Sequence, residues 1–95
     1  MMKIRAKLFL YKEGRGKPFE NGYRPLFNFG STSLVSGRIT LPLEKKLVYP
    51  GEEIKADIDF ISKDYFGKKL RIGEKILFSE SKVPLGEIEI IEIYK

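Results

Sequence analysis

The stretch EIKADIDF, residues 53–60, gives the most regular alternation of apolar and polar side chains in the chain. Ile54, Ala56, Ile58 and Phe60 fall at every second position, with charged residues between them. Because side chains of an extended strand point alternately to two faces, this period of two predicts a strand with one buried face. The same alternation over residues 3–11 predicts a second strand of this kind.

Further extended segments are predicted at residues 24–30, 34–41, 47–49 and 70–78, and from Pro84 towards the C-terminus. Within the 34–41 segment, Gly37 predicts a bulge or a close approach to another element.

Two other local features interrupt or connect the predicted strands. Pro50-Gly51 predicts a type II turn, with proline at its second position and glycine at its third. Residues 62–69 are polar and irregular, and we expect one helical turn at residues 64–66.

The last predicted strand changes phase between Ile88 and Ile93. Ile88 and Ile90 share one face, whereas Ile91 and Ile93 share the other. A β-bulge near Ile90 and Ile91 would return both pairs to the core.

Six or seven short strands separated by turns predict an all-β fold. We expect residues 1–95 to form one domain, a small closed antiparallel β-barrel with Greek-key-like connections. Closure is favoured because it removes exposed strand edges.

Composition excludes several kinds of chemistry. The chain has no cysteine and no histidine, so thiolate chemistry, disulfides and the usual general base are absent. We expect no enzyme activity, no metal and no cofactor. Lys3, Arg5 and Lys7 interrupt the apolar positions near the N-terminus, so neither a signal peptide nor a membrane span is predicted and a cytoplasmic location is expected.

The net charge of +5 is concentrated in one part of the sequence. Residues 1–38 contain eight Lys and Arg against two Glu, whereas the remainder contains ten basic and eleven acidic residues. Such an excess favours an anionic partner, with nucleic acid the first candidate, although basic domains also use charge for solubility alone.

The most distinctive basic segment is KEGRGKPFENGYRPLFNF, residues 12–29. Its glycine-rich loop carries Arg15 and Lys17, which could approach phosphates closely or simply lie in a plain connecting loop. The loop lacks the G-x-x-x-x-G-K-(S/T) pattern of a nucleotide-binding P-loop, so no nucleotide is expected. Phe27 and Phe29 are expected in the core, with a stacking or docking surface as the alternative, and Tyr23 is the aromatic residue most readily expected to be exposed.

The segments GYRPLFNFGSTSLVSGRITLP, residues 22–42, and LVYPGEEIKADIDF, residues 47–60, resemble the third, C-terminal β-barrel domain of bacterial elongation factor Tu. The similarity runs in the same motif order from about Lys3 to Ile93, here as a stand-alone domain. It implies the barrel fold of that family. In the family, this domain contacts the T-stem backbone of aminoacyl-tRNA and also binds other proteins of translation.

Residues of the partner-binding motifs are only partly kept. Arg15 corresponds to the arginine of the family loop E-G-G-R-H-x-P-F, and Arg24 to the arginine of G-Y-R-P. The family turn R-E-G-G-R-T-V-G corresponds to residues 79–86, where only Glu80 and Gly86 survive. The resemblance therefore implies RNA or tRNA binding without the GTPase function of the whole factor.

The expected function is that of a non-catalytic module that binds the RNA or tRNA backbone. The alternative is a protein–protein interaction module that docks on or mimics the translation machinery, with RNA binding lost. Its sign would be an exposed apolar patch built from Tyr11, Tyr23, Phe27 or Tyr49. The candidate contact residues are Arg15, Lys17, Tyr23, Arg24, Glu80 and Lys82.

Overall fold

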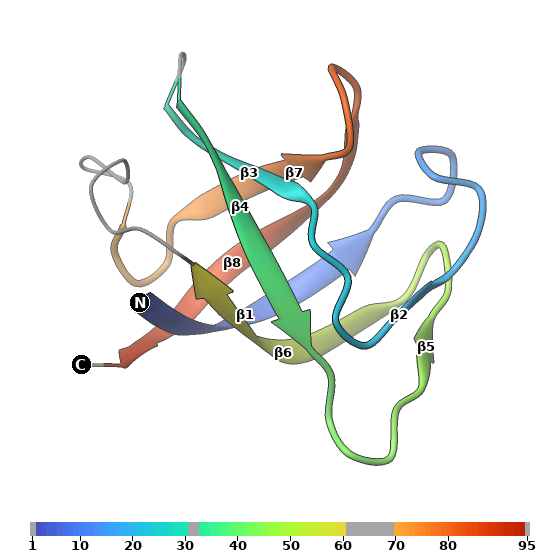
Figure 1. The fold of residues 1–95 in the computed structure, drawn as a ribbon, viewed down its shortest axis with the longest axis horizontal. Helices are drawn as coiled ribbons and strands as arrows, with labels where there is room; N and C mark the ends of the chain where they lie inside the picture. Colours follow the sequence, from blue (N-terminus) through green and yellow to red (C-terminus); the bar gives the residue numbers. More distant parts are fainter. Residues whose placement is uncertain (1, 31–32, 61–69, 95) are drawn as a thin grey trace.

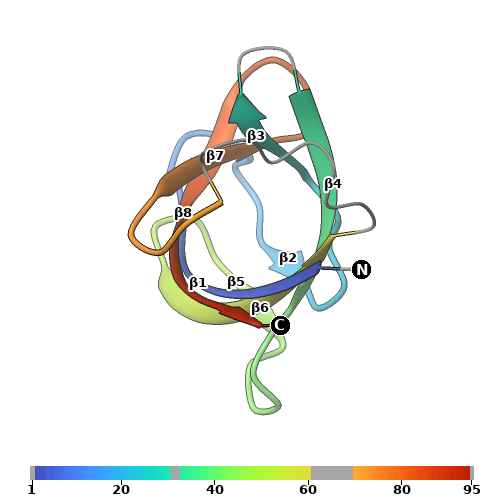
Figure 2. The same cartoon turned by 90° about the vertical axis from the view of Figure 1, so that its left-hand side faces the viewer.

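A computed structural model of the chain describes residues 2–30, 33–60 and 70–94. Its strands are β1 (Met2–Leu10), β2 (Phe19–Glu20), β3 (Leu26–Gly30), β4 (Ser33–Thr40), β5 (Leu47–Val48), β6 (Glu53–Phe60), β7 (Lys75–Ser79) and β8 (Pro84–Tyr94). Six of them close into an antiparallel barrel in the order β1-β6-β4-β3-β7-β8, with β8 pairing back onto β1. Figure 2 shows these strands surrounding one axis. The predicted all-β fold and closed antiparallel barrel are confirmed.

The alternation of β6 gives the expected buried face. Ala56, Ile58 and Phe60 are buried, whereas Asp57 and Asp59 lie on the outer face, opposite Arg5 and Lys3 of β1. The core side chains come from all six barrel strands and from the short β2–β5 pair; the largest are Phe19, Phe27, Phe60, Phe78, Ile4, Leu8, Leu10, Ile39, Ile58, Ile76 and Ile88. Phe27 and Phe29 thus belong to the core, as expected.

The predicted close approach at Gly37 is confirmed. A Cβ atom there would lie 2.7 Å from Phe60 Cε1, 2.8 Å from Phe27 Cε2 and 2.9 Å from Ile58 Cγ2. Only a residue without a side chain allows these three core residues to pack over β4.

The turn at Pro50-Gly51 forms as predicted. Gly51 has a φ of +92°, and the amide of Glu52 donates to the carbonyl of Tyr49 at 3.0 Å. Proline followed by a glycine of positive φ matches a type II turn.

Three predictions about local structure need correction or lie outside the described residues, and one strand was missed. The predicted 70–78 strand begins only at Lys75, because residues 71–74 form a turn. In this turn the amide of Glu74 donates to the carbonyl of Arg71 at 3.2 Å. The 24–30 segment becomes a strand at Leu26, after Pro25, which cannot donate a ladder hydrogen bond. The two-residue strand β2 was not predicted. The expected helical turn at 64–66 lies outside the described residues.

The predicted β-bulge lies where the sequence places it, but its consequence differs. Arg5 pairs with Glu92 and Ala6 with Ile90, so Ile91 is the extra residue. Ile93 packs against the core, whereas Ile91 remains exposed. The bulge thus returns Ile93 to the core but leaves Ile91 outside it.

Candidate binding site

The β1–β2 loop, residues 11–18, lies at the end of the barrel away from the termini, beside the β7–β8 hairpin (Figure 1). The amide of Tyr11 donates to the carbonyl of Leu85 at 2.9 Å, which joins the start of the loop to β8. Gly14 packs so closely on Leu85 that a Cβ atom would lie 3.0 Å from its Cα atom. The glycine-rich loop is therefore held against the hairpin.

Three of the predicted site residues meet in one cluster. The Arg15 guanidinium forms an ion pair with the carboxylate of Glu80, and the Tyr23 hydroxyl donates to Glu80 Oε2 at 2.6 Å. Arg15 Cζ also lies 4.7 Å from the centre of the Tyr23 ring, which adds a cation–π contact. This Arg15–Tyr23–Glu80 cluster joins the β1–β2 loop, the β2–β3 connection and the β7–β8 hairpin.

Tyr23 is half-buried, whereas Phe27 and Phe29 are buried, so it is the most exposed of these three aromatic residues, as expected. Its ring stacks on the buried Phe19 ring, with centroids 4.7 Å apart and an angle of 26° between the planes. Burial, and then the hydrogen bond to Glu80, raise the pKa of Tyr23 above the ordinary value for tyrosine. The hydroxyl consequently stays protonated at neutral pH and remains a hydrogen-bond donor.

The other three predicted residues, Lys17, Arg24 and Lys82, are exposed. None of them makes an ion pair or side-chain hydrogen bond with any residue that the structure describes. Each lies within two residues of a member of the cluster: Lys17 follows Arg15, Arg24 follows Tyr23, and Lys82 follows Glu80. We call these three residues the cationic surface.

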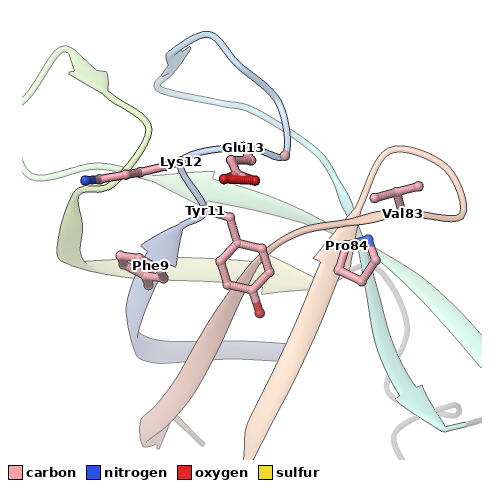
Figure 3. Close-up of a pocket in the computed structure, with 7 residues that line it drawn as sticks. Phe9, Tyr11, Lys12, Glu13, Val83 and Pro84 are labelled. Carbon is pink, nitrogen blue, oxygen red and sulfur yellow. The ribbon is translucent and has the colours of Figure 1, made fainter.

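An aromatic groove of about 510 Å³ lies between the start of the β1–β2 loop and the β7–β8 hairpin (Figure 3). It is lined by Phe9, Tyr11, Lys12, Glu13, Gly14, Val83 and Pro84. The Phe9 and Tyr11 rings meet edge to face, 5.7 Å apart. The sequence analysis named Tyr11 as a possible surface residue but did not name Phe9 or the hairpin residues. Phe9 could have been found, because Phe9 and Tyr11 both fall at outward positions of the predicted strand at residues 3–11.

A second groove, of about 320 Å³, lies on the other side of the hairpin. We call it the Lys82 groove; its lining residues are Asn28, Leu34, Leu77, Phe78, Ser79, Ser81, Lys82 and Pro84. No carboxylate is among them, and Lys82 of the cationic surface supplies the charge. Pro84 lines both grooves.

Only one of the four residues named for an apolar patch lines the aromatic groove. Of the four residues named for it, Phe27 is buried, Tyr23 is half-buried on Phe19, and Tyr49, 52% exposed, lies outside the aromatic groove. Only Tyr11 lines the groove, because it follows a strand whose outer face also carries Phe9.

A scan against models of protein families finds none that matches this chain. Within residues 2–30, 33–60 and 70–94, no group of three or more carboxylate side chains is arranged to hold a metal ion. The same residues contain no helix that is long and apolar enough to cross a membrane.

Proposed function

We propose that this chain is a non-catalytic cytoplasmic module, related to the C-terminal domain of elongation factor Tu, that binds the RNA backbone. One observation carries the proposal. The Arg15–Tyr23–Glu80 cluster joins three segments of the chain, and each segment carries one exposed cation, unpaired among the described residues, within two positions of a cluster member. Long cationic side chains on fixed segments are suited to contacting successive phosphates.

The roles of the six candidate residues then differ. Arg15 has its charge balanced by Glu80, and its side chain is only 16% exposed, so it positions the loop rather than contacting phosphate. Lys17, Arg24 and Lys82 make the contacts. The Lys82 groove supports this assignment, because Ser79, Ser81 and Asn28 provide hydrogen-bond donors beside Lys82, and the nearby Glu80 carboxylate is paired with Arg15.

Backbone contacts of this kind carry no sequence information, so duplex RNA, including a tRNA stem, is the expected ligand. The absence of histidine and cysteine from the sequence supports a binding role rather than catalysis.

Salt dependence of binding to labelled tRNA tests the proposal. Three phosphate contacts predict a slope of log affinity against log salt of roughly −3, and replacing one cation with glutamine should reduce its magnitude by about 1. The variants are Lys17→Gln, Arg24→Gln and Lys82→Gln. Lys46→Gln is the matched control, since Lys46 is also exposed and unpaired among the described residues but lies in the β4–β5 connection.

A salt-independent affinity, or a control variant that weakens binding as much as the other three, would contradict the proposal.

Recognition of a protein partner, with RNA binding lost, is the second candidate function. The aromatic groove favours it, because exposed aromatic and apolar walls are more typical of protein recognition than of phosphate binding.

A further inference from the structure

The aromatic groove has chemistry opposite to that of the cationic surface. Its floor is the outward-facing Phe9 and Tyr11, and its far wall is Val83 and Pro84 of the hairpin (Figure 3). Val83 is 63% exposed, so this wall is open to a ligand. The Tyr11 hydroxyl donates to Glu87 Oε1 at 3.0 Å, which fixes the direction of its ring.

Carboxylates surround these aromatic rings. In the barrel, Phe9 lies directly opposite Glu53 of β6 and Glu87 of β8. Residues directly opposite on antiparallel strands bring their side chains close together on the same face. Glu13 lines the groove itself and lies next to Tyr11 (Figure 3). Phe9 and Tyr11 are thus bordered by three carboxylates from three elements of the fold.

Cations of the chain balance only one of these three carboxylates. Within the described parts of the chain, Lys75 Nζ forms an ion pair with Glu87 Oε2 at 3.9 Å, whereas neither Glu13 nor Glu53 has an ion-pair partner. Lys12 lines the groove, but its ammonium group points away from Val83 and Pro84 (Figure 3). Its aliphatic stem lies over Gly51, where a Cβ atom would come within 3.1 Å of Lys12 Cγ.

An apolar aromatic surface bordered by anions is complementary to a lysine or arginine side chain. The aliphatic stem would pack on Phe9, Tyr11 and Pro84 while the cation meets the ring faces and the carboxylates. A nucleic acid phosphate would be repelled by the same carboxylates. We propose that the aromatic groove binds a segment of a partner protein in which a basic residue is flanked by apolar residues.

This site does not depend on RNA binding by the cationic surface. The probe is a fluorescein-labelled peptide in which arginine alternates with leucine and proline, measured by fluorescence anisotropy against the whole chain. Glu13→Gln and Glu53→Gln should each weaken binding by up to about fivefold, as expected for exposed charge pairs. Tyr11→Ala should weaken it by about tenfold or more, because it removes a central contact.

Two controls make the result specific. Glu44→Gln removes an exposed carboxylate far along the chain, in the β4–β5 connection, and should leave affinity unchanged. A peptide with citrulline in place of arginine keeps the shape without the charge and should bind more weakly. Circular dichroism confirms that each variant is folded.

Three results would overturn the assignment: no binding of the arginine peptide, equal binding of the citrulline peptide, or weaker tRNA binding in Tyr11→Ala. The last result would place RNA in the groove. The tRNA measurements on the lysine and arginine variants are separate, so a failure of the RNA proposal and a failure of the peptide proposal can be distinguished.

Discussion

The two sides of the β7–β8 hairpin differ in charge although they share Pro84. On one side, the Lys82 groove contains Lys82 and has no carboxylate among its lining residues. On the other, the aromatic groove contains both Lys12 and Glu13 and borders on Glu53 and Glu87. The comparison shows that a net charge of +5 describes the whole chain and not its individual faces. One end of a small barrel therefore carries differently charged side chains on the two sides of one hairpin.

The largest expected effect on stability comes from Gly86→Ala, which should disturb both sides of the β7–β8 hairpin at once. A Cβ atom there would lie 2.4 Å from the Phe9 carbonyl oxygen and 2.5 Å from Phe78 Cζ. Since the backbone of β1 cannot move without opening the barrel, we expect a loss of roughly 2–3 kcal/mol in the free energy of unfolding. Urea denaturation measures this loss, and tRNA and peptide affinities should fall together.

The control for this variant is Gly30→Ala, because a Cβ atom at Gly30 meets nothing within 4 Å. Its stability should change by only a few tenths of a kcal/mol. If Gly86→Ala were as stable as Gly30→Ala, or if only one of the two binding activities fell, the hairpin would not be the shared support of the two surfaces.

The next largest effect concerns the Arg15–Glu80 ion pair. It distinguishes the role of this pair in holding the three segments together from the effect of its charges on RNA binding. A double-mutant cycle of Arg15→Ala and Glu80→Ala should give a coupling of about 1 kcal/mol in unfolding free energy, the upper range for pairs in which one partner is half-exposed. For RNA, two effects of Glu80→Ala oppose each other. Loss of a negative charge near Lys82 favours binding, whereas release of the joined segments disfavours it.

We expect the positional effect to dominate, so that Glu80→Ala weakens tRNA binding by a few-fold. Tighter tRNA binding in this variant would show that the main effect of Glu80 is to repel the RNA phosphates, and that the cluster does not position the cations. Tyr23→Phe provides an intermediate case, because it removes the hydrogen bond to Glu80 and keeps the ring on Phe19.

The sequence predicted the barrel better than the site for a physical reason. Alternation in residues 53–60 and the phase change near Ile90 are local, so strand positions and the bulge can be derived from neighbouring residues. The Arg15–Glu80 ion pair joins residues 65 positions apart, and no local pattern indicates it. The six candidate residues could be named, but which three would be paired and which three free depended on the tertiary structure.

The aromatic groove could likewise be predicted only in part from local sequence patterns. Phe9 and Tyr11 are visible as outward positions of one strand, yet the carboxylates beside them come from β6, β8 and the β1–β2 loop. Only the strand order of the closed barrel brings Glu53 and Glu87 to opposite sides of Phe9. An excess of basic residues in the first 38 positions gave no indication of an acidic face.

A region outside both surfaces provides a pH test. Glu52 accepts hydrogen bonds from Lys45 Nζ at 2.5 Å and from the Tyr49 amide at 2.7 Å, and these bonds, the one from Lys45 first, lower its pKa below the ordinary value of a glutamate, 4.5. A carboxylate with a lowered pKa stabilises the fold above its unfolded pKa, and the stabilisation is lost as pH falls through the folded value. Glu52→Gln should therefore lose less stability than the parent chain on acidification below about pH 4.5. Thermal unfolding at neutral and acidic pH measures the difference, and parallel losses in the two proteins would contradict it.

The smallest expected effect concerns the border of the acidic face. Lys55 of β6 lies directly opposite Lys7 of β1, and like charges at opposite positions are unfavourable. Lys7 also faces Glu89 of β8, which offsets part of the repulsion. Lys55→Gln should therefore raise the unfolding free energy by only about 0.2–0.5 kcal/mol. Thermal unfolding at low ionic strength resolves such a change best, because salt screens the repulsion.

The same substitution tests how sharply the two surfaces are separated. Lys55 shares the outer face of β6 with Glu53, so its removal should make the carboxylates around Phe9 slightly more attractive to the arginine peptide. The affinity for tRNA should remain that of the parent chain, because Lys55 lies on β6, outside the three segments that the Arg15–Tyr23–Glu80 cluster joins. Lys46→Gln removes the same charge from the β4–β5 connection, outside the barrel strands, and should change neither stability nor peptide affinity. If Lys55→Gln instead weakened tRNA binding as strongly as Lys17→Gln, the basic surface would extend across β6, and the division of this end of the barrel into an anion-binding and a cation-binding side would be wrong.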